Sequence, residues 1–335
     1  MKKLFLFLSV IVFFSCRQKK NIPDVSSIRI DLKVERFEKD FFSIDTNNVA
    51  ASLDSLNIKY PSFLKDYLYN ILGAIPQPDS VIKYVGFFKK DYQSIYAASQ
   101  QKIPSFDIYK KQIERGLQFL KYYFPNYKTP RAIITFVGPL DGTANAITAS
   151  GVAIGLQSYL GKNFPAYQSQ YIRDVYPEYK SRRFEPDYIS VNCMKGIIED
   201  MYPYKGTGRP LIEQIVETGK RLYVLDALLP EVADTLKTGY TQKQLDGCFA
   251  NEKNIWSFFI ENNLLFETEP NLIGVYVNDG PNTPDLGSAS PGFIGQFIGW
   301  QIVKKWMDKN KNISLPELMN KNPKDLFEES KYKAN

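Results

Sequence analysis

The sequence predicts an α+β protein that is predominantly helical and has a small β-sheet. Two observations support this fold class. Most long segments repeat apolar residues at intervals of three to four, which places them on one face of a helix. Only the stretches 28–37, 130–137 and 146–160 have the alternating or continuous apolar pattern of strands. With 335 residues, 44% of them hydrophobic, the chain is long enough to bury a substantial core.

The amino-terminal residues 1–15 predict a lipoprotein signal peptide. Two lysines precede an apolar run too short to span a membrane, and Ser15 comes directly before Cys16. This ending resembles a bacterial lipobox, in which the cysteine becomes the acylated first residue of the mature protein. We expect Cys16 to carry acyl chains such as palmitate, because several such chains anchor a protein firmly without a spanning helix. Residues 16–27 are then an acylated tether, and residues 28–335 a single globular domain.

The first half of the globular part is expected to contain the strands. Apolar and polar residues alternate in Ile28–Phe37, which predicts a half-exposed strand. Residues 48–121 are expected to be mainly helical, with Ile108–Tyr123 as the clearest helix. Further strands are expected at Pro130–Val137 and within Ala146–Leu160.

The second half is expected to be helical. Apolar spacing and helix-starting or helix-stopping residues predict helices at Pro186–Met201, Leu211–Leu229, Thr241–Asn262, Leu315–Met319 and Pro323–Glu329. A loop rich in glycine, proline and aspartate is expected at residues 278–289.

The most informative helix is predicted at Ser290–Met307, with Ser290 as its cap. Aromatic and aliphatic residues recur on one side of this segment, which indicates a buried face. Gly292, Gly295 and Gly299 each lower helix propensity by about 1 kcal/mol relative to alanine. Three such glycines indicate that another element approaches this helix closely.

The absence of histidine excludes several kinds of active site. The chain has no histidine, so it has no Ser-His-Asp or Cys-His scheme and no zinc site that depends on imidazole. No EF-hand spacing is present either, and we expect no metal or other cofactor. Apart from Cys16, the cysteines are Cys193 and Cys248, whose pairing the sequence leaves open.

The charge pattern excludes a nucleic-acid partner. The formal net charge of +6 is mild and dispersed, without an arginine-rich stripe. The stretch GLQSYLGKN is not a phosphate-binding loop, because five residues separate Gly155 from Gly161 and Asn163 stands where serine or threonine is required.

Five stretches together carry a resemblance to a known family. They are the lipobox at Cys16, VERFEKDFF at 34–42, GVAIGLQSYLG at 151–161, GKRLYVLDALLP at 219–230 and SPGFIGQFIGWQIVKKWM at 290–307. Because of these stretches, the chain resembles the gliding-motility lipoprotein GldB family of Bacteroidetes. The stretches are spread along the chain, so the resemblance covers essentially its full length. The resemblance implies a lipid-anchored protein of the cell envelope, facing the periplasm or the exterior, that supports gliding motility and the associated secretion machinery. Its expected partners are the membrane and other envelope proteins; whether the membrane is inner or outer stays open.

The order of elements is also similar to predicted zinc peptidases of the gluzincin type. In that family a His-Glu-x-x-His helix holds the metal, and a third ligand follows in a Glu-Gly sequence. Asn192, Cys193 and Gly196 stand where His, Glu and His would be, and Glu217 matches the third ligand. This similarity implies a zincin-like layout without the metal site. It also implies an inactive pseudopeptidase, not an enzyme. Loss of the metal leaves the shape of the cleft and its strand edges, so binding of an extended peptide or another ligand there stays open.

Two other functions stay open. The first is an envelope hydrolase that uses converging carboxylates or a Ser-Lys pair, with candidates Glu217, Asp226, Asp279, Asp285 and Ser150. The second is a small-ligand-binding lipoprotein with a cavity beside the 290–307 helix, lined by Trp300, Tyr223 and Tyr159.

Overall fold

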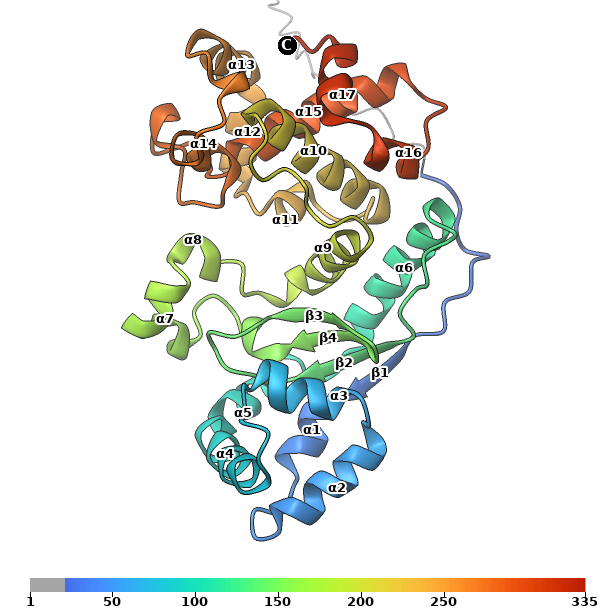
Figure 1. The fold of residues 1–335 in the computed structure, drawn as a ribbon, viewed down its shortest axis with the longest axis vertical. Helices are drawn as coiled ribbons and strands as arrows, with labels where there is room; N and C mark the ends of the chain where they lie inside the picture. Colours follow the sequence, from blue (N-terminus) through green and yellow to red (C-terminus); the bar gives the residue numbers. More distant parts are fainter. Residues whose placement is uncertain (1–21, 335) are drawn as a thin grey trace, which may run out of the picture.

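The computed structural model describes residues 22–334. The expected signal peptide 1–15 and the lipidation site Cys16 lie outside the described residues, and the tether 16–27 is described only from residue 22. Figure 1 shows a mainly helical protein with one small sheet, which confirms the predicted α+β class. No helix among residues 22–334 combines the length and apolar composition needed to cross a membrane.

The sheet has four strands in the order β1-β2-β4-β3. They are β1 (Lys33–Arg36), β2 (Ala132–Phe136), β3 (Asn145–Thr148) and β4 (Gly151–Gly155). β1, β2 and β4 run parallel, whereas β3 is an antiparallel edge strand paired with β4. Every residue of β2 and β4 is buried, as the continuous apolar sequence of a central strand predicts.

The predicted first strand is only partly confirmed. The sequence predicts Ile28–Phe37, but the observed strand covers Lys33–Arg36 and a helix begins at Phe37. Phe37 packs its ring against Phe63 and Tyr67, with centroids 4.9 and 4.7 Å apart. This aromatic cluster stabilises a helical turn where the alternating pattern predicts more strand.

Helices cover both ends of the sheet. At one end, shown in blue to teal in Figure 1, lie α1 (Phe37–Phe42), α2 (Val49–Lys59), α3 (Phe63–Lys65), the π-helix η1 (Asp66–Ile71), α4 (Pro78–Asp91) and α5 (Gln93–Lys102). The helix α6 (Asp107–Tyr123) runs from the sheet toward the other end. The helical prediction for residues 48–121 is thus confirmed.

The segment after the sheet leads to α9, which connects the two ends. It contains η2 (Leu156–Ser158), η3 (Pro165–Gln168), α7 (Gln170–Val175), α8 (Glu178–Ser181), η4 (Pro186–Tyr188) and α9 (Ile189–Met201). α9 packs against α6, β3 and β4 on one side and against α10 on the other (Figure 1). It therefore lies between the sheet and the carboxy-terminal helices.

The carboxy-terminal half is helical, as predicted. It contains α10 (Leu211–Leu228), α11 (Asp234–Thr238), α12 (Gln242–Ala250), α13 (Glu252–Glu261), η5 (Leu264–Phe266), α14 (Pro270–Val277), η6 (Pro284–Leu286), α15 (Ile294–Lys309), α16 (Leu315–Asn320) and α17 (Pro323–Ser330). The single helix expected at Thr241–Asn262 is wrong, because Asn251 leaves helical geometry and separates α12 from α13. The Thr241 cap is confirmed, since its side chain accepts a hydrogen bond from the backbone N–H of Gln244.

Glycines allow α10 and α15 to cross in close contact, as the sequence indicates. A β-carbon added at Gly219 would lie 2.2 Å from the backbone of Gly299, and one added at Gly299 would lie 1.9 Å from the carbonyl oxygen of Ile215. No larger residue fits these positions without a backbone shift. The crossing fixes the two helices that carry much of the site described below.

The start of α15 differs from the prediction. The helix begins at Ile294, and Ser290 does not cap it. Its hydroxyl instead donates to the carbonyl oxygen of Gly287 at 2.6 Å and closes the preceding loop. The residue before the helix, Phe293, has a left-handed backbone with φ of 57°, which is uncommon for a bulky residue. The Tyr240 hydroxyl donates to its carbonyl oxygen at 2.9 Å and holds this conformation.

Candidate functional site

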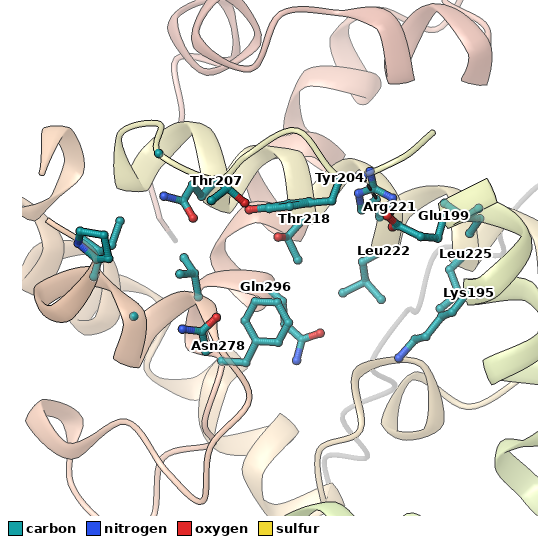
Figure 2. A pocket seen from close by; sticks show the side chains of 18 of the residues that line it. Lys195, Glu199, Tyr204, Thr207, Thr218, Arg221, Leu222, Leu225, Asn278 and Gln296 are labelled. Carbon is teal, nitrogen blue, oxygen red and sulfur yellow. Dashed lines mark hydrogen bonds and ion pairs between the residues drawn. The ribbon is translucent and has the colours of Figure 1, made fainter. Parts of the chain in front are cut away.

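A cavity of about 520 Å³ opens between α9, α10, α14 and the start of α15 (Figure 2). Its wall is mainly apolar, formed by Ile198, Leu222, Leu225, Ile273 and Val277. Amide and hydroxyl side chains interrupt this wall, namely Thr207, Gln214, Thr218, Thr268, Asn278 and Gln296. The size and this mixture are typical of ligand-binding cavities.

A smaller cavity of about 300 Å³ adjoins the first one at Lys195, which lines both. Its other lining residues are Lys180, Arg183, Phe184, Tyr188, Asn192 and Gly239. The two cavities therefore lie on either side of one lysine of α9.

The α9 residues that the peptidase similarity singles out point in different directions. Asn192 lines the smaller cavity, and its amide donates to the Tyr159 hydroxyl at 3.1 Å. Cys193 faces the core, where burial raises the pKa of its thiol to about 12. Gly196 is half-buried, and a β-carbon added there would meet nothing within 4 Å. Cys193 and Cys248 are both free, buried thiols.

Glu217 lies in an ion-pair network of its own. Its carboxylate is 2.8 Å from Lys220 Nζ and 3.6 Å from an Arg221 nitrogen. Lys220 also donates to the backbone carbonyls of Met319 and Lys321, which ties α10 to α16. Within residues 22–334, no hydrogen bond connects Glu217 to the three α9 positions. The structure therefore does not join the four predicted site residues into one cluster.

The carboxylates proposed for a hydrolase are also dispersed. Asp226 pairs with Lys237, Asp279 with Arg183, and Asp285 accepts a hydrogen bond from the Tyr276 hydroxyl at 2.7 Å. Ser150 lies at the turn between β3 and β4, where its backbone N–H donates to Thr148. In the described part of the chain, no three cysteine, aspartate or glutamate side chains gather as metal ligands.

The cavity expected beside the 290–307 helix is present, but its lining differs from the prediction. Trp300 and Tyr159 are at most 1% exposed and belong to the core. Neither they nor Tyr223 lines the cavities described above. Phe293 and Gln296 contribute instead, because the cavity lies at the amino-terminal end of α15.

Lys195 is the site residue that sequence reasoning did not find. Its side chain is exposed to solvent in the cavities, and the protein atoms that line them lower the pKa of its amine to about 8. Burial is the main cause, Arg183 lowers the pKa further, and Asp279 opposes the change. Lys195 could have been recognised in the sequence because it is the only charged residue in the run ISVNCMKGII at 189–198.

These features define a predominantly helical α+β protein with one mixed four-stranded sheet and an open cavity beside its central helices. The family model described as "Gliding motility protein GldB" matches residues 18–334. The chain therefore belongs to this family of gliding-motility lipoproteins, as its sequence motifs indicate. No curated protein and no solved structure matches the chain.

Proposed function

We propose that this protein is anchored by acyl chains on Cys16 and supports gliding motility and the associated secretion as a non-catalytic, protein-binding component of the envelope. The observation that carries the proposal is the open cavity of about 520 Å³, which apolar, amide and hydroxyl side chains line together. Such a surface suits a peptide segment, since a peptide offers both apolar side chains and backbone hydrogen-bonding groups. The protein faces the periplasm or the cell exterior.

The charged groups support a non-catalytic role. General acid-base catalysis needs titratable groups that converge on one substrate atom. The chain has no histidine, and the carboxylates of Glu217, Asp226 and Asp279 are each engaged in a different ion pair with lysine or arginine side chains.

A degenerate, zincin-like peptidase layout forms part of the proposal. α9 packs against the antiparallel edge strand β3, next to the parallel strands of the sheet. Asn192, Cys193 and Gly196 occupy the positions on this helix where a peptidase would carry its metal ligands and general base. On this proposal the fold has kept a peptide-binding cleft and has lost the metal ligands and the general base of a peptidase.

The proposal is tested by proximity labelling in envelope fractions of wild-type cells and cells with Cys16→Ala, with spreading scored on the same cultures. We expect motility or secretion proteins to be recovered with the wild type and lost, together with spreading, in the variant. Recovery of no partner with unaltered spreading would contradict the proposal. Metal-dependent peptide hydrolysis by the purified full-length protein would also contradict it.

A further inference from the structure

Lys195 occupies an unusual position for a lysine. It extends from α9 into the larger cavity in Figure 2 and also lines the smaller one. Among residues 22–334, Lys195 takes part in none of the hydrogen bonds or ion pairs described above, although the Asp279 carboxylate lies near enough to raise its pKa. Its side chain is exposed to the solvent in these cavities, so an anionic group that enters either cavity can reach the amine and form an ion pair with it.

The neighbouring charges do not supply that partner. Glu199 is 2.9 Å from Arg221, and the pair lies at the edge of the cavity in Figure 2. Lys237 lies 3.2 Å from Asp234 and also pairs with Asp226.

In the smaller cavity the positive charge is again in excess. Arg183 pairs with Asp279, and Lys180 adds a further cation. Burial raises the pKa of Tyr188 in this cavity and of Tyr204 in the larger one, so both phenols are neutral near pH 7. The two cavities therefore offer an anion an excess of positive charge, with Lys195 at the point where they meet.

The other side chains that line the larger cavity determine which kind of ligand can carry the anionic group. Apolar side chains from α9, α10 and α14 provide its main surface. Asn278 and Thr218 supply amide and hydroxyl groups among them, and Gln296 keeps its side-chain oxygen as an acceptor while its nitrogen donates to Thr238 at 3.0 Å. A hydrocarbon tail would leave the Asn278 amide and the Gln296 oxygen without a hydrogen bond, whereas a peptide backbone can pair with them.

We propose that Lys195 binds the C-terminal carboxylate of an apolar peptide tail, whose last residues occupy the larger cavity. This inference rests on the proposed function and specifies the segment of the partner that is recognised. The ammonium and the terminal carboxylate form a charge-assisted hydrogen bond. The carboxylate thus compensates the charge of a lysine that forms no ion pair within residues 22–334.

Proton linkage gives the inference a pH signature. In the free protein the pKa of Lys195 is about 8, and a bound carboxylate raises it. Above pH 8 binding must then take up a proton, so affinity falls by up to about tenfold for each pH unit. Below pH 8 affinity stays constant until the peptide carboxylate itself becomes protonated.

The test uses the full-length protein in lipid nanodiscs and a pool of hexapeptides whose last three residues vary among Ala, Leu, Val and Phe. Each sequence is supplied with a free and with an amidated C-terminus, and bound peptides are counted by mass spectrometry. We expect free-carboxylate peptides to bind at least tenfold better than their amides. Lys195→Met should abolish this preference, Lys195→Arg should restore it, and Lys111→Met on the exposed face of α6 should leave it unchanged.

A second variant separates the carboxylate contact from the space for the tail. Val277→Trp places an indole ring in the larger cavity, narrows it and keeps Lys195, so it should weaken binding of both peptide forms while thermal unfolding shows an intact fold. Equal binding of carboxylate and amide peptides to the wild type would overturn the inference. A preference that survives in Lys195→Met, or binding of decanoate in place of every peptide, would overturn it as well.

These outcomes are distinguishable from failure of the proposed function. If envelope partners are recovered from cells but no peptide binds, the inference fails and the protein-binding role stands. If no partner is recovered, the proposed function itself is contradicted.

Discussion

Glu217 illustrates how the same residue type can indicate catalysis in a sequence and stability in a structure. Its carboxylate lies beside Lys220, whose side chain is 2% exposed. Glu217→Gln leaves this buried cation without its counter-charge, so we expect the free energy of unfolding to fall by about 3 kcal/mol. Glu213→Gln on the same helix removes a 3.5 Å pair with a partly exposed arginine and should cost less than about 0.5 kcal/mol. Urea denaturation checks both values, and equal stability of the two variants would contradict this role of Glu217.

Lys195 lowers the stability of the folded protein near neutral pH, whereas Glu217 raises it. Its pKa is about 8 in the folded protein and 10.5 in the reference state, so the unfolded chain holds this proton more tightly. The charged amine therefore destabilises the fold below pH 8, and its contribution becomes more favourable as pH rises toward 10.5. We expect Lys195→Met to raise the melting temperature at pH 7, with a gain that shrinks above pH 8. If the gain in melting temperature is constant between pH 7 and pH 10.5, or if Lys111→Met shows the same gain, the titration of Lys195 is not its cause.

At the scale of elements, the glycine contact between α10 and α15 makes a prediction with an internal control. Gly219→Ala places a β-carbon 2.2 Å from the Gly299 backbone and should destabilise the protein by about 3 kcal/mol. Gly196→Ala on α9 meets no atom within 4 Å and should stabilise it by about 1 kcal/mol through helix propensity. Differential scanning calorimetry measures both changes. A tolerated alanine at 219 would contradict the close packing.

Local sequence patterns predicted most of the helices and strands. They failed where a contact with a residue far away in the sequence determines the backbone conformation. The apolar periodicity of α10 and the glycines of α15 are properties of single segments, so the sequence displays them. The start of α15 is different, because Tyr240 fixes the left-handed Phe293 and Gly292 packs against the Gly280 backbone. These partners lie elsewhere in the chain, and a helix-start pattern such as Ser290-Pro291 does not reveal them.

At the scale of the whole molecule, motifs dispersed along the chain identified the family, but the site was only partly predictable. The cavity forms where α9, α10, α14 and α15 meet, and its location depends on their packing. That Lys195 lines both cavities and forms no ion pair within residues 22–334 can be seen only from the packed structure. Residues chosen by similarity to peptidases, such as Glu217, proved to be spread over separate interactions.

Whether the cavity binds an envelope protein can be measured in cells that carry wild-type protein, Val277→Trp or Lys111→Met at equal levels in the membrane. We expect Val277→Trp to lose both the labelled envelope partners and spreading, because tryptophan narrows the cavity while Cys16 is unchanged. Lys111→Met should behave as the wild type. Full partner recovery and normal spreading with the narrowed cavity would contradict the claim.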